Sequence, residues 1–416
     1  MKSVWLRPLG MAMALALGAG SAHAGDALFS PMERAREKGL AVDESFQALI
    51  ESPATASLQL VQADAQAVNE KAAALILNLE PGLELRAYQV ESYVNKSGIL
   101  VWSGVLEDLG WSTIPFSAKE LRFNPVNYVT MVRNGDKITG NVHFEGVWYQ
   151  IRPLHSGGHA IVAVDRKAMP PDHPREYANL PVIPMPRRSA PLEKVDTVIR
   201  VLVNYTASAA AASGDIVGLI NLAVVESNQG YTNSDVFIDM ELAGQGQTTY
   251  TESGDFDTDL TRYRTPGDGF MDEIHTTRDS VAADVALLVI NNTAYCGLAS
   301  GIGSTAATAF ATAYWGCITG YYSFAHEIGH LQSARHDPLN DSTNTPYAYG
   351  HGFQSNFSNP RWRTIMAYDC LLFGCPRLNY WSNPNKTYNG RAMGTANRHD
   401  NARVLNDTRA TVAAYR

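Results

Sequence analysis

The chain has 416 residues, of which 45% are hydrophobic and 18% are charged, and its formal net charge is -8. This length is enough for two or three domains, and the composition is that of a globular protein rather than a disordered one. The acidic balance, without a dense block of Lys and Arg, argues against nucleic acid as a partner, because nucleic-acid-binding proteins normally present a basic face.

The first 24 residues have the pattern of a signal peptide. Lys2 and Arg7 precede a short apolar stretch over residues 11–20, and Ala22-His23-Ala24 supplies the small residues that signal peptidase requires. The apolar stretch is too short to span a bilayer. We therefore expect residues 1–24 to be removed and the protein to be secreted without a membrane anchor.

The next region is predicted to be a small α+β domain followed by a linker. Residues 30–79 are Ala-rich and helix-like, whereas residues 83–165 alternate short β-type runs with turn signals. Residues 168–192 are rich in proline and include the dibasic pair Arg187-Arg188, which predicts an extended linker.

Strand-like and helix-like runs alternate after the linker, as in an α/β domain. Strands are predicted at residues 197–205, 236–242, 285–290 and 307–315, a helix at 215–229, and a helical stretch with a Pro-Gly break at 256–284.

The four cysteines all lie in this second region, and an even number in an exported protein favours disulfides. Pairing nearest neighbours closes short loops, so we favour Cys296 with Cys317 and Cys370 with Cys375. Three pairings are open from sequence alone. No C-x-x-C spacing occurs, which argues against a cysteine-rich metal site.

Residues 324–337, FAHEIGHLQSARHD, carry the strongest indication of chemistry. His326 and His330 are four apart on one helix face, where both imidazoles can reach one ion, and Glu327 is placed to take a proton from water. His336 is six residues further on, so the helix must end before it for this third imidazole to reach the same ion. Three imidazoles leave one position of Zn²⁺ open, as in catalytic sites, which predicts zinc-dependent peptide hydrolysis.

Two other residue types are alternatives for the third ligand. Zinc peptidases that use a downstream Glu are excluded, because no Glu follows Glu327. Asp337 is the other alternative, but His336 has the expected spacing, so we interpret Asp337 as a hydrogen-bonding neighbour that braces the turn.

The segment HEIGHLQSARHD, together with RTIMAY and YWSNP downstream, resembles the bacterial peptidyl-Asp metalloendopeptidases, which are reprolysin-like metzincin zinc proteases. The likeness covers about residues 195–416. It implies a metzincin fold for residues 193–416, in which a twisted, mostly parallel sheet carries an active-site helix and a Met-turn. Metzincins have glycine where this chain has Ser333, and a non-Gly residue in a left-handed conformation costs roughly 1–2 kcal/mol.

The resemblance also assigns roles to two residues of the Met-turn. Met366 would lie beneath the zinc. Tyr368 takes the position of a tyrosine that ligates zinc or stabilises the oxyanion in some metzincins; an ordinary packed aromatic is the alternative.

The family's preference for cleaving before Asp directs attention to a cationic stretch. Between residues 361 and 391, basic side chains exceed acidic ones by four. Arg forms bidentate contacts with carboxylates, so a cation here could bind the substrate's acidic side chain. The candidates are Arg361, Arg363 and Arg377, and solvated surface is the alternative.

Residues 25–188 resemble the propeptides of reprolysin-like proteases, particularly in GVWYQIRPLHSGGHAIVAVD, which implies a latent precursor. No cysteine precedes Cys296, so a thiolate cannot block the metal. Asp165, Asp172 or His173 could block it instead, and a steric plug is an alternative. A fragment that begins near residues 189–195 would be the active form.

The expected partners are protein or peptide substrates and the chain's own propeptide as inhibitor. A secreted binding or adhesion protein on the same scaffold, or a hydrolase of cell-wall peptides, are the alternative functions. The acidic stretch over residues 252–284 lacks the spacing of an EF-hand, so Ca²⁺ is unsupported.

Overall fold

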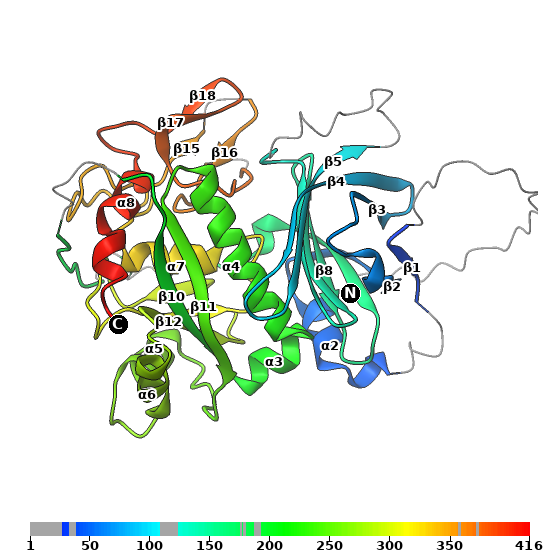
Figure 1. Ribbon diagram of the computed structural model, residues 1–416, viewed down its shortest axis with the longest axis horizontal. Coiled ribbons are helices and arrows are strands. Elements are labelled where there is room, and N and C mark those ends of the chain that lie inside the picture. Colours follow the sequence, from blue (N-terminus) through cyan, green and yellow to red (C-terminus); the bar gives the residue numbers. More distant parts are fainter. Residues whose placement is uncertain are drawn as a thin grey trace, which may run out of the picture.

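The computed structural model describes residues 27–32, 39–108, 124–174, 177, 180–186, 193–356, 359–371 and 374–416. The predicted signal peptide and the dibasic pair Arg187-Arg188 lie outside these ranges. Two large sheets, one on each side of the proline-rich segment in the sequence, make up most of the described chain. Figure 1 shows them side by side, with the long helix α4 between them.

The first sheet has nine strands in the order β1-β2-β9-β8-β7-β6-β5-β4-β3, and every pair is antiparallel. The strands are β1 (Phe29–Pro31), β2 (Thr55–Ala63), β3 (Ala74–Glu80), β4 (Leu83–Val94), β5 (Leu100–Asp108), β6 (Tyr128–Asn134), β7 (Lys137–Phe144), β8 (Val147–Pro153) and β9 (His159–Val164). Helix α2 (Glu44–Glu51) packs near it and is capped by the carboxylate of Asp43. The described residues of this half also form the short 3₁₀ turns η1 (Leu40–Val42), η2 (Ala65–Ala67) and η3 (Arg166–Ala168).

Among the described residues of this range, 30–32 and 39–79, the helical prediction is wrong outside α2 and two of these short turns. Strands β2 and β3 occupy much of this region. In β3, the side chains of Leu75, Leu77 and Leu79 are buried and the residues between them are more exposed. Such a period of two is typical of a strand with one face on a core. The Ala-rich composition concealed it.

The second sheet has five strands in the order β11-β10-β12-β14-β13, parallel except for the edge strand β13. Burial of all six residues of β12 agrees with its continuous apolar sequence at the sheet centre. The strands are β10 (Thr197–Tyr205), β11 (Ile238–Gln247), β12 (Val285–Ile290), β13 (Gly297–Ala299) and β14 (Phe310–Tyr314). The helices are α3 (Ala207–Ser213), α4 (Ile216–Asn233), α5 (Phe256–Arg264), α6 (Glu273–Ser280), α7 (Ser323–Leu331) and α8 (Asn401–Val412). Two short antiparallel pairs are β15 (Gln354–Ser355) with β16 (Trp362–Arg363) and β17 (Asn383–Tyr388) with β18 (Arg391–Met393).

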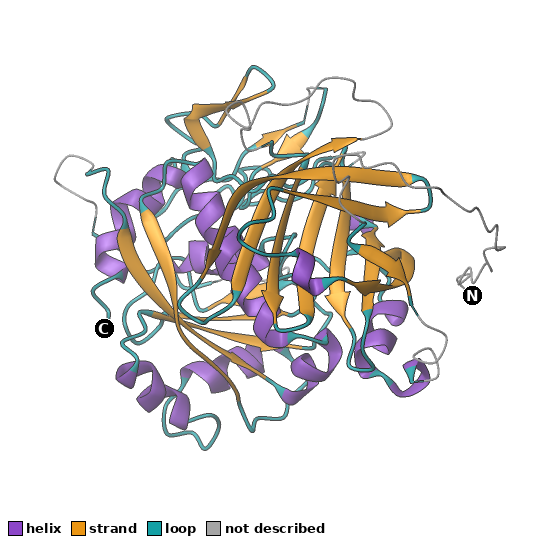
Figure 2. Cartoon of the chain, turned by 45° about the vertical axis from the view of Figure 1, so that its right-hand side comes forward, coloured by secondary structure: helices purple, strands orange, loops and turns teal. Residues whose placement is uncertain are grey.

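Helix α4 joins the two halves. It contacts β6 and β7 of the first sheet, and β11 and α7 of the second half, an arrangement that can be followed in Figure 2. Glu226 of α4 accepts hydrogen bonds from Asn141 Nδ2 (2.6 Å) and from the N–H of Gly320 (2.7 Å). Trp148 of β8 and Phe324 of α7 belong to one apolar core. The first half therefore packs directly on the second.

The structure pairs Cys296 with Cys317 and Cys370 with Cys375, which is the pairing that the sequence favoured. The first disulfide ties the start of β13 to the loop that leads into α7. Among the described residues, no single helix has the length and apolar composition needed to cross a membrane, although α3 and α4, bent by 85°, reach that composition together.

Candidate metal centre

Helix α7 lies in the core and carries the first two histidines of the motif. His326 and His330 are 1% and 0% exposed, and their ring centroids are 4.8 Å apart, as residues on one helix face should be. A Cβ at Gly329 would come within 3.1 Å of Met366 Sδ and 2.7 Å of the Trp381 ring. Glycine at this position lets Met366 pack closely against α7.

The chain reverses direction after α7 at Ser333, whose φ is +75°. The N–H of Ser333 donates to His330 O (2.9 Å), and the N–H of Ala334 donates to Gly329 O (2.9 Å). These are the two hydrogen bonds of a Schellman C-cap, which usually has glycine at this position. The serine therefore adopts the left-handed conformation, and His336 returns to the helix.

The Nε2 atoms of three histidines converge on one point. His336 Nε2 lies 3.0 Å from His326 Nε2 and 3.1 Å from His330 Nε2. The Nδ1 atoms of His326 and His330 lie 2.9 Å from Ile365 O and 2.8 Å from Ala334 O. Because a carbonyl oxygen only accepts, each of these Nδ1 atoms carries the proton and each Nε2 presents a lone pair. Three imidazole nitrogens this close together, two of them presenting lone pairs, form a donor set that fits a metal ion.

A fourth histidine, His173, enters this cluster from the proline-rich segment. Its ring centroid lies 4.9, 5.0 and 4.7 Å from those of His326, His330 and His336. The ligand atoms of the four histidines all lie within 4.8 Å of one another. His173, one of the three residues that the sequence offered as a group to block the metal, therefore lies in the cluster.

His173 also contacts Glu327, because its Nε2 lies 3.1 Å from both carboxyl oxygens. Burial lowers the pKa of His173 to about 3, which favours a hydrogen bond over an ion pair for this contact. Burial, and then the negative charge of Asp172, raise the pKa of Glu327 well above its usual range. In this form of the chain, Glu327 is engaged by His173.

Tyr177 is a neighbour of the cluster that the sequence analysis missed. Its hydroxyl lies 3.1 Å from His330 Nδ1, and its ring centroid lies 4.0 Å from that of His336. Tyr177 is the one aromatic residue (Phe, Trp or Tyr) between residues 168 and 192 of the sequence. This isolated aromatic side chain could have marked it as a candidate. Asp165 lies elsewhere, where its carboxylate accepts the N–H of Lys167 (3.0 Å).

Tyr368 lies beside the cluster, as its position after Met366 suggested. Its N–H donates to Asp337 Oδ2 (3.0 Å), so Asp337 braces the turn. The Tyr368 ring centroid is 4.4 Å from that of His336, and its hydroxyl is 3.4 Å from His173 Nδ1. The hydroxyl is therefore close enough to act on a group bound at the cluster.

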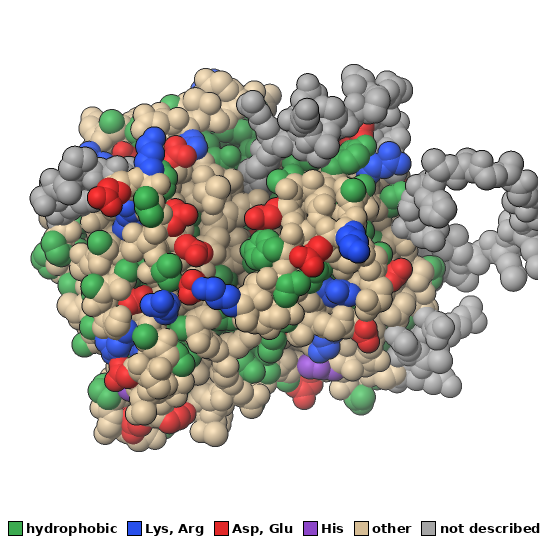
Figure 3. Space-filling model, viewed as in Figure 1, with side chains coloured by type: hydrophobic (Ala, Val, Ile, Leu, Met, Phe, Trp, Pro, Cys, Tyr) green, Lys and Arg blue, Asp and Glu red, His purple; other side chains and the backbone are tan. Residues whose placement is uncertain are grey.

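Two of the three candidate arginines lie together near the cluster. The side chains of Arg363 and Arg377 are 1% and 2% exposed, and Asp172 Oδ2 lies 3.6 Å from Arg363 Nη1 and 2.7 Å from Arg377 Nη2. On the molecular surface, by contrast, acidic and basic side chains are interspersed, as the face drawn in Figure 3 shows. The alternative that these two arginines are solvated surface is wrong. Arg361 is half-buried, and its role stays a prediction.

The segment that carries Asp172 and His173 runs beside the edge strand β13. The N–H of Cys296 donates to Pro171 O (2.8 Å), and the N–H of Gly297 donates to Asp172 O (3.2 Å). The predicted linker is thus extended at this point, and it is docked on the second half of the chain.

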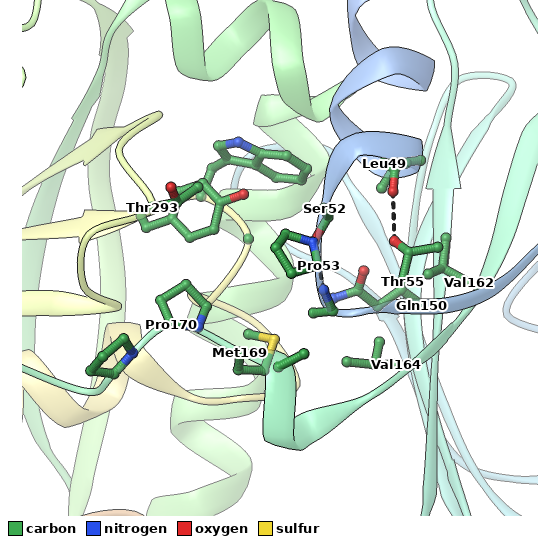
Figure 4. A pocket seen from close by; sticks show the side chains of 16 residues that line it. Leu49, Ser52, Pro53, Thr55, Gln150, Val162, Val164, Met169, Pro170 and Thr293 are labelled. Carbon is green, nitrogen blue, oxygen red and sulfur yellow. Dashed lines mark hydrogen bonds between the residues drawn. The ribbon is translucent and has the colours of Figure 1, made fainter. Parts of the chain in front are cut away.

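A cavity of about 290 Å³ lies where this segment leaves the first half. In Figure 4, Met169 and Pro170 line one side of it, Ser52 and Pro53 another, and Thr293 a third. Its lining includes none of the four clustered histidines. We interpret this cavity as part of the seam between the halves rather than as a substrate site.

Comparisons with known proteins identify the family of the chain. Residues 195–382 match the Metallo-peptidase family M12. A peptidyl-Asp metalloendopeptidase of Stenotrophomonas maltophilia is 48% identical over 421 residues, covering 98% of this chain and 97% of that protein. One of Xanthomonas campestris pv. campestris is 46% identical over 413 residues, covering 97% of both. One of Pseudomonas fragi is 50% identical over 192 residues, covering 46% of this chain and 100% of that protein. The predicted metalloendopeptidase activity is confirmed, and the chain belongs to the peptidyl-Asp metalloendopeptidase family.

Proposed function

We propose that this chain is the inactive precursor of a secreted zinc endopeptidase, in which His326, His330 and His336 bind the ion and Glu327 is the general base. The convergence of the three Nε2 atoms, two of them fixed as lone-pair donors, carries this proposal. Imidazole nitrogens suit Zn²⁺, and three of them leave a coordination position open for catalysis.

The chain's own groups supply the proton transfers and charge stabilisation. Bound zinc would polarise the scissile carbonyl and acidify a water molecule next to Glu327. The Glu327 carboxylate takes a proton from the attacking water and passes it to the leaving amine. The Tyr368 hydroxyl, close to the ring of His336, is positioned to donate a hydrogen bond to the oxyanion of the tetrahedral intermediate.

Latency is proposed to arise from His173. Its imidazole lies among the three histidines, and its Nε2 is hydrogen-bonded to the Glu327 carboxyl group. In the precursor, the general base is therefore engaged and the space for a substrate carbonyl is filled. Cleavage near residues 189–195 would allow the segment to leave and would free both groups.

The proposed substrates are proteins cut on the amino side of Asp. The names of the relatives, peptidyl-Asp metalloendopeptidase, support this preference. Secretion is supported by the signal-peptide pattern of residues 1–24 and by two disulfides, since such bonds persist in oxidising compartments.

The test uses the purified full-length precursor. We expect maturation to give a new N-terminus near residues 189–195, and the product to cut a denatured protein before Asp. A chelator should abolish cleavage and added Zn²⁺ should restore it, as measured by mass spectrometry of the fragments. Cleavage that resists the chelator, or activity on cell-wall peptides but not on denatured protein, would contradict the proposal.

A further inference from the structure

Arg377 and Arg363 are held in place by groups of the second half of the chain. Arg377 Nη1 and Nη2 donate to Tyr321 O (2.9 Å) and Ala367 O (3.1 Å), and Arg363 Nη1 donates to Ala367 O (2.9 Å). The guanidinium carbon of Arg377 lies 4.4 Å from the centre of the Tyr321 ring. None of these supporting groups comes from the segment that carries Asp172. The two guanidinium groups are therefore organised independently of that segment.

Among the described residues, two carboxylates form ion pairs with these arginines, Asp172 and Asp369. Asp369 is the weaker partner, because it is 41% exposed and lies 3.8 Å from Arg363 Nε. Asp172 is 7% exposed and contacts both guanidinium groups. Removing one partner from a buried ion pair leaves an uncompensated charge, which is strongly unfavourable. When Asp172 leaves, the pair loses its buried carboxylate partner and becomes available to bind another carboxylate.

The position of this pair relative to the metal centre fits a substrate side chain. Asp172 precedes His173, which lies among the metal-binding histidines, and Ala367, which anchors both arginines, follows Met366 of the Met-turn. The carboxylate subsite is thus about one residue away from the reaction centre.

The backbone of Asp172 also follows the path open to an extended peptide. Its carbonyl accepts the N–H of Gly297 in the edge strand β13, and the preceding carbonyl accepts the N–H of Cys296. Extended peptides commonly add to an exposed sheet edge through such main-chain hydrogen bonds, while pockets select their side chains.

We infer that Arg377, supported by Arg363 and Tyr321, is the subsite that selects the acidic side chain of the substrate, and that the precursor closes this subsite with its own Asp172. The inference rests on the proposed endopeptidase function and adds to it a single site for specificity and latency. The positive charge of Arg377 would both recognise the substrate's carboxylate and hold the propeptide through Asp172.

The first test compares two peptide substrates that differ only by Asp or Asn after the cut. Arg377→Gln in the matured enzyme should lower the Asp/Asn ratio of kcat/KM by about 10- to 100-fold, the value of a charge-assisted hydrogen bond. The loss should fall on the Asp substrate. The matched control is Arg391→Gln, an exposed residue of the same cationic stretch, which should keep the ratio.

The second test needs no substitution in the enzyme. A peptide of residues 169–174 should inhibit wild-type matured enzyme, and Asp172→Asn in that peptide should raise its inhibition constant at least about 10-fold. The difference between the two peptides should be smaller for Arg377→Gln, because Arg363 alone then faces the carboxylate. Equal inhibition of the wild type by the two peptides, or an unchanged Asp/Asn ratio in active Arg377→Gln, would overturn the inference.

The outcomes also separate this inference from the proposed function. If Arg377→Gln does not fold, the peptide pair on the wild-type enzyme decides. If the matured wild type cleaves nothing, the proposed function fails, and calorimetric binding of the same two peptides still tests whether the subsite recognises a carboxylate.

Discussion

Glu327→Gln is expected to lower kcat/KM of the matured enzyme by about 10³-fold, the size of a general-base contribution. The amide has the shape of the carboxyl group and cannot take a proton from water. Because the three histidines hold the ion in our proposal, zinc content should be unchanged. The measurement is peptide turnover together with metal analysis, after maturation of the variant by added wild-type enzyme that is then removed.

Glu273→Gln is the matched control for this experiment. Glu273 lies exposed in the first turn of α6, so its replacement should leave turnover at the wild-type level. If Glu327→Gln kept more than about a tenth of the wild-type rate, Glu327 would lose its role as general base. Loss of zinc along with activity would point to Glu327 as a ligand instead.

His173→Ala is expected to make the uncleaved precursor hydrolyse a short peptide at least about 10-fold faster, because a buried hydrogen bond to Glu327 is lost. The substitution also vacates space among the metal-binding histidines, into which water or a substrate carbonyl can enter. The initial rate is measured before any new N-terminus appears on a gel.

Asp165→Asn is the matched control for latency, since Asp165 lies in the same half and bonds to Lys167 rather than to the cluster. It should remain as inactive as the wild-type precursor. A His173→Ala precursor as inactive as the wild type would show that the rest of the propeptide blocks the site sterically.

The cluster of His326, His330 and His336 could be predicted because the spacing that brings these residues together is local. His326 and His330 sit on one turn of a helix, and the six-residue step to His336 requires only that the helix ends between them. At Ser333 the sequence departs from the glycine that metzincins have. The structure shows that tertiary packing and two cap hydrogen bonds hold this serine in a conformation that glycine usually adopts.

The contacts that close the site could not be predicted, because they join distant parts of the chain. His173 is 154 residues from Glu327, and Asp172 is 205 residues from Arg377. The sequence offered these two with Asp165 as equal candidates, since nothing local distinguishes a carboxylate at the site from one that caps a turn. Only the docking of the segment on β13 separates them.

The fold was predictable where burial produces an unbroken pattern. The apolar run of β12 and the strand β10 lie where the sequence placed them, at residues 285–290 and 197–205. In residues 30–79, composition and periodicity disagreed, and the period of two in β3 was the better guide to the structure.

The most direct test of the central claim is the zinc content of the matured protein after dialysis, compared between wild type and His336→Ala. We expect one zinc ion per wild-type chain and little or none in His336→Ala, because two remaining imidazoles bind zinc far more weakly than three. A His336→Ala protein that retained one zinc ion per chain and full peptide turnover would contradict it.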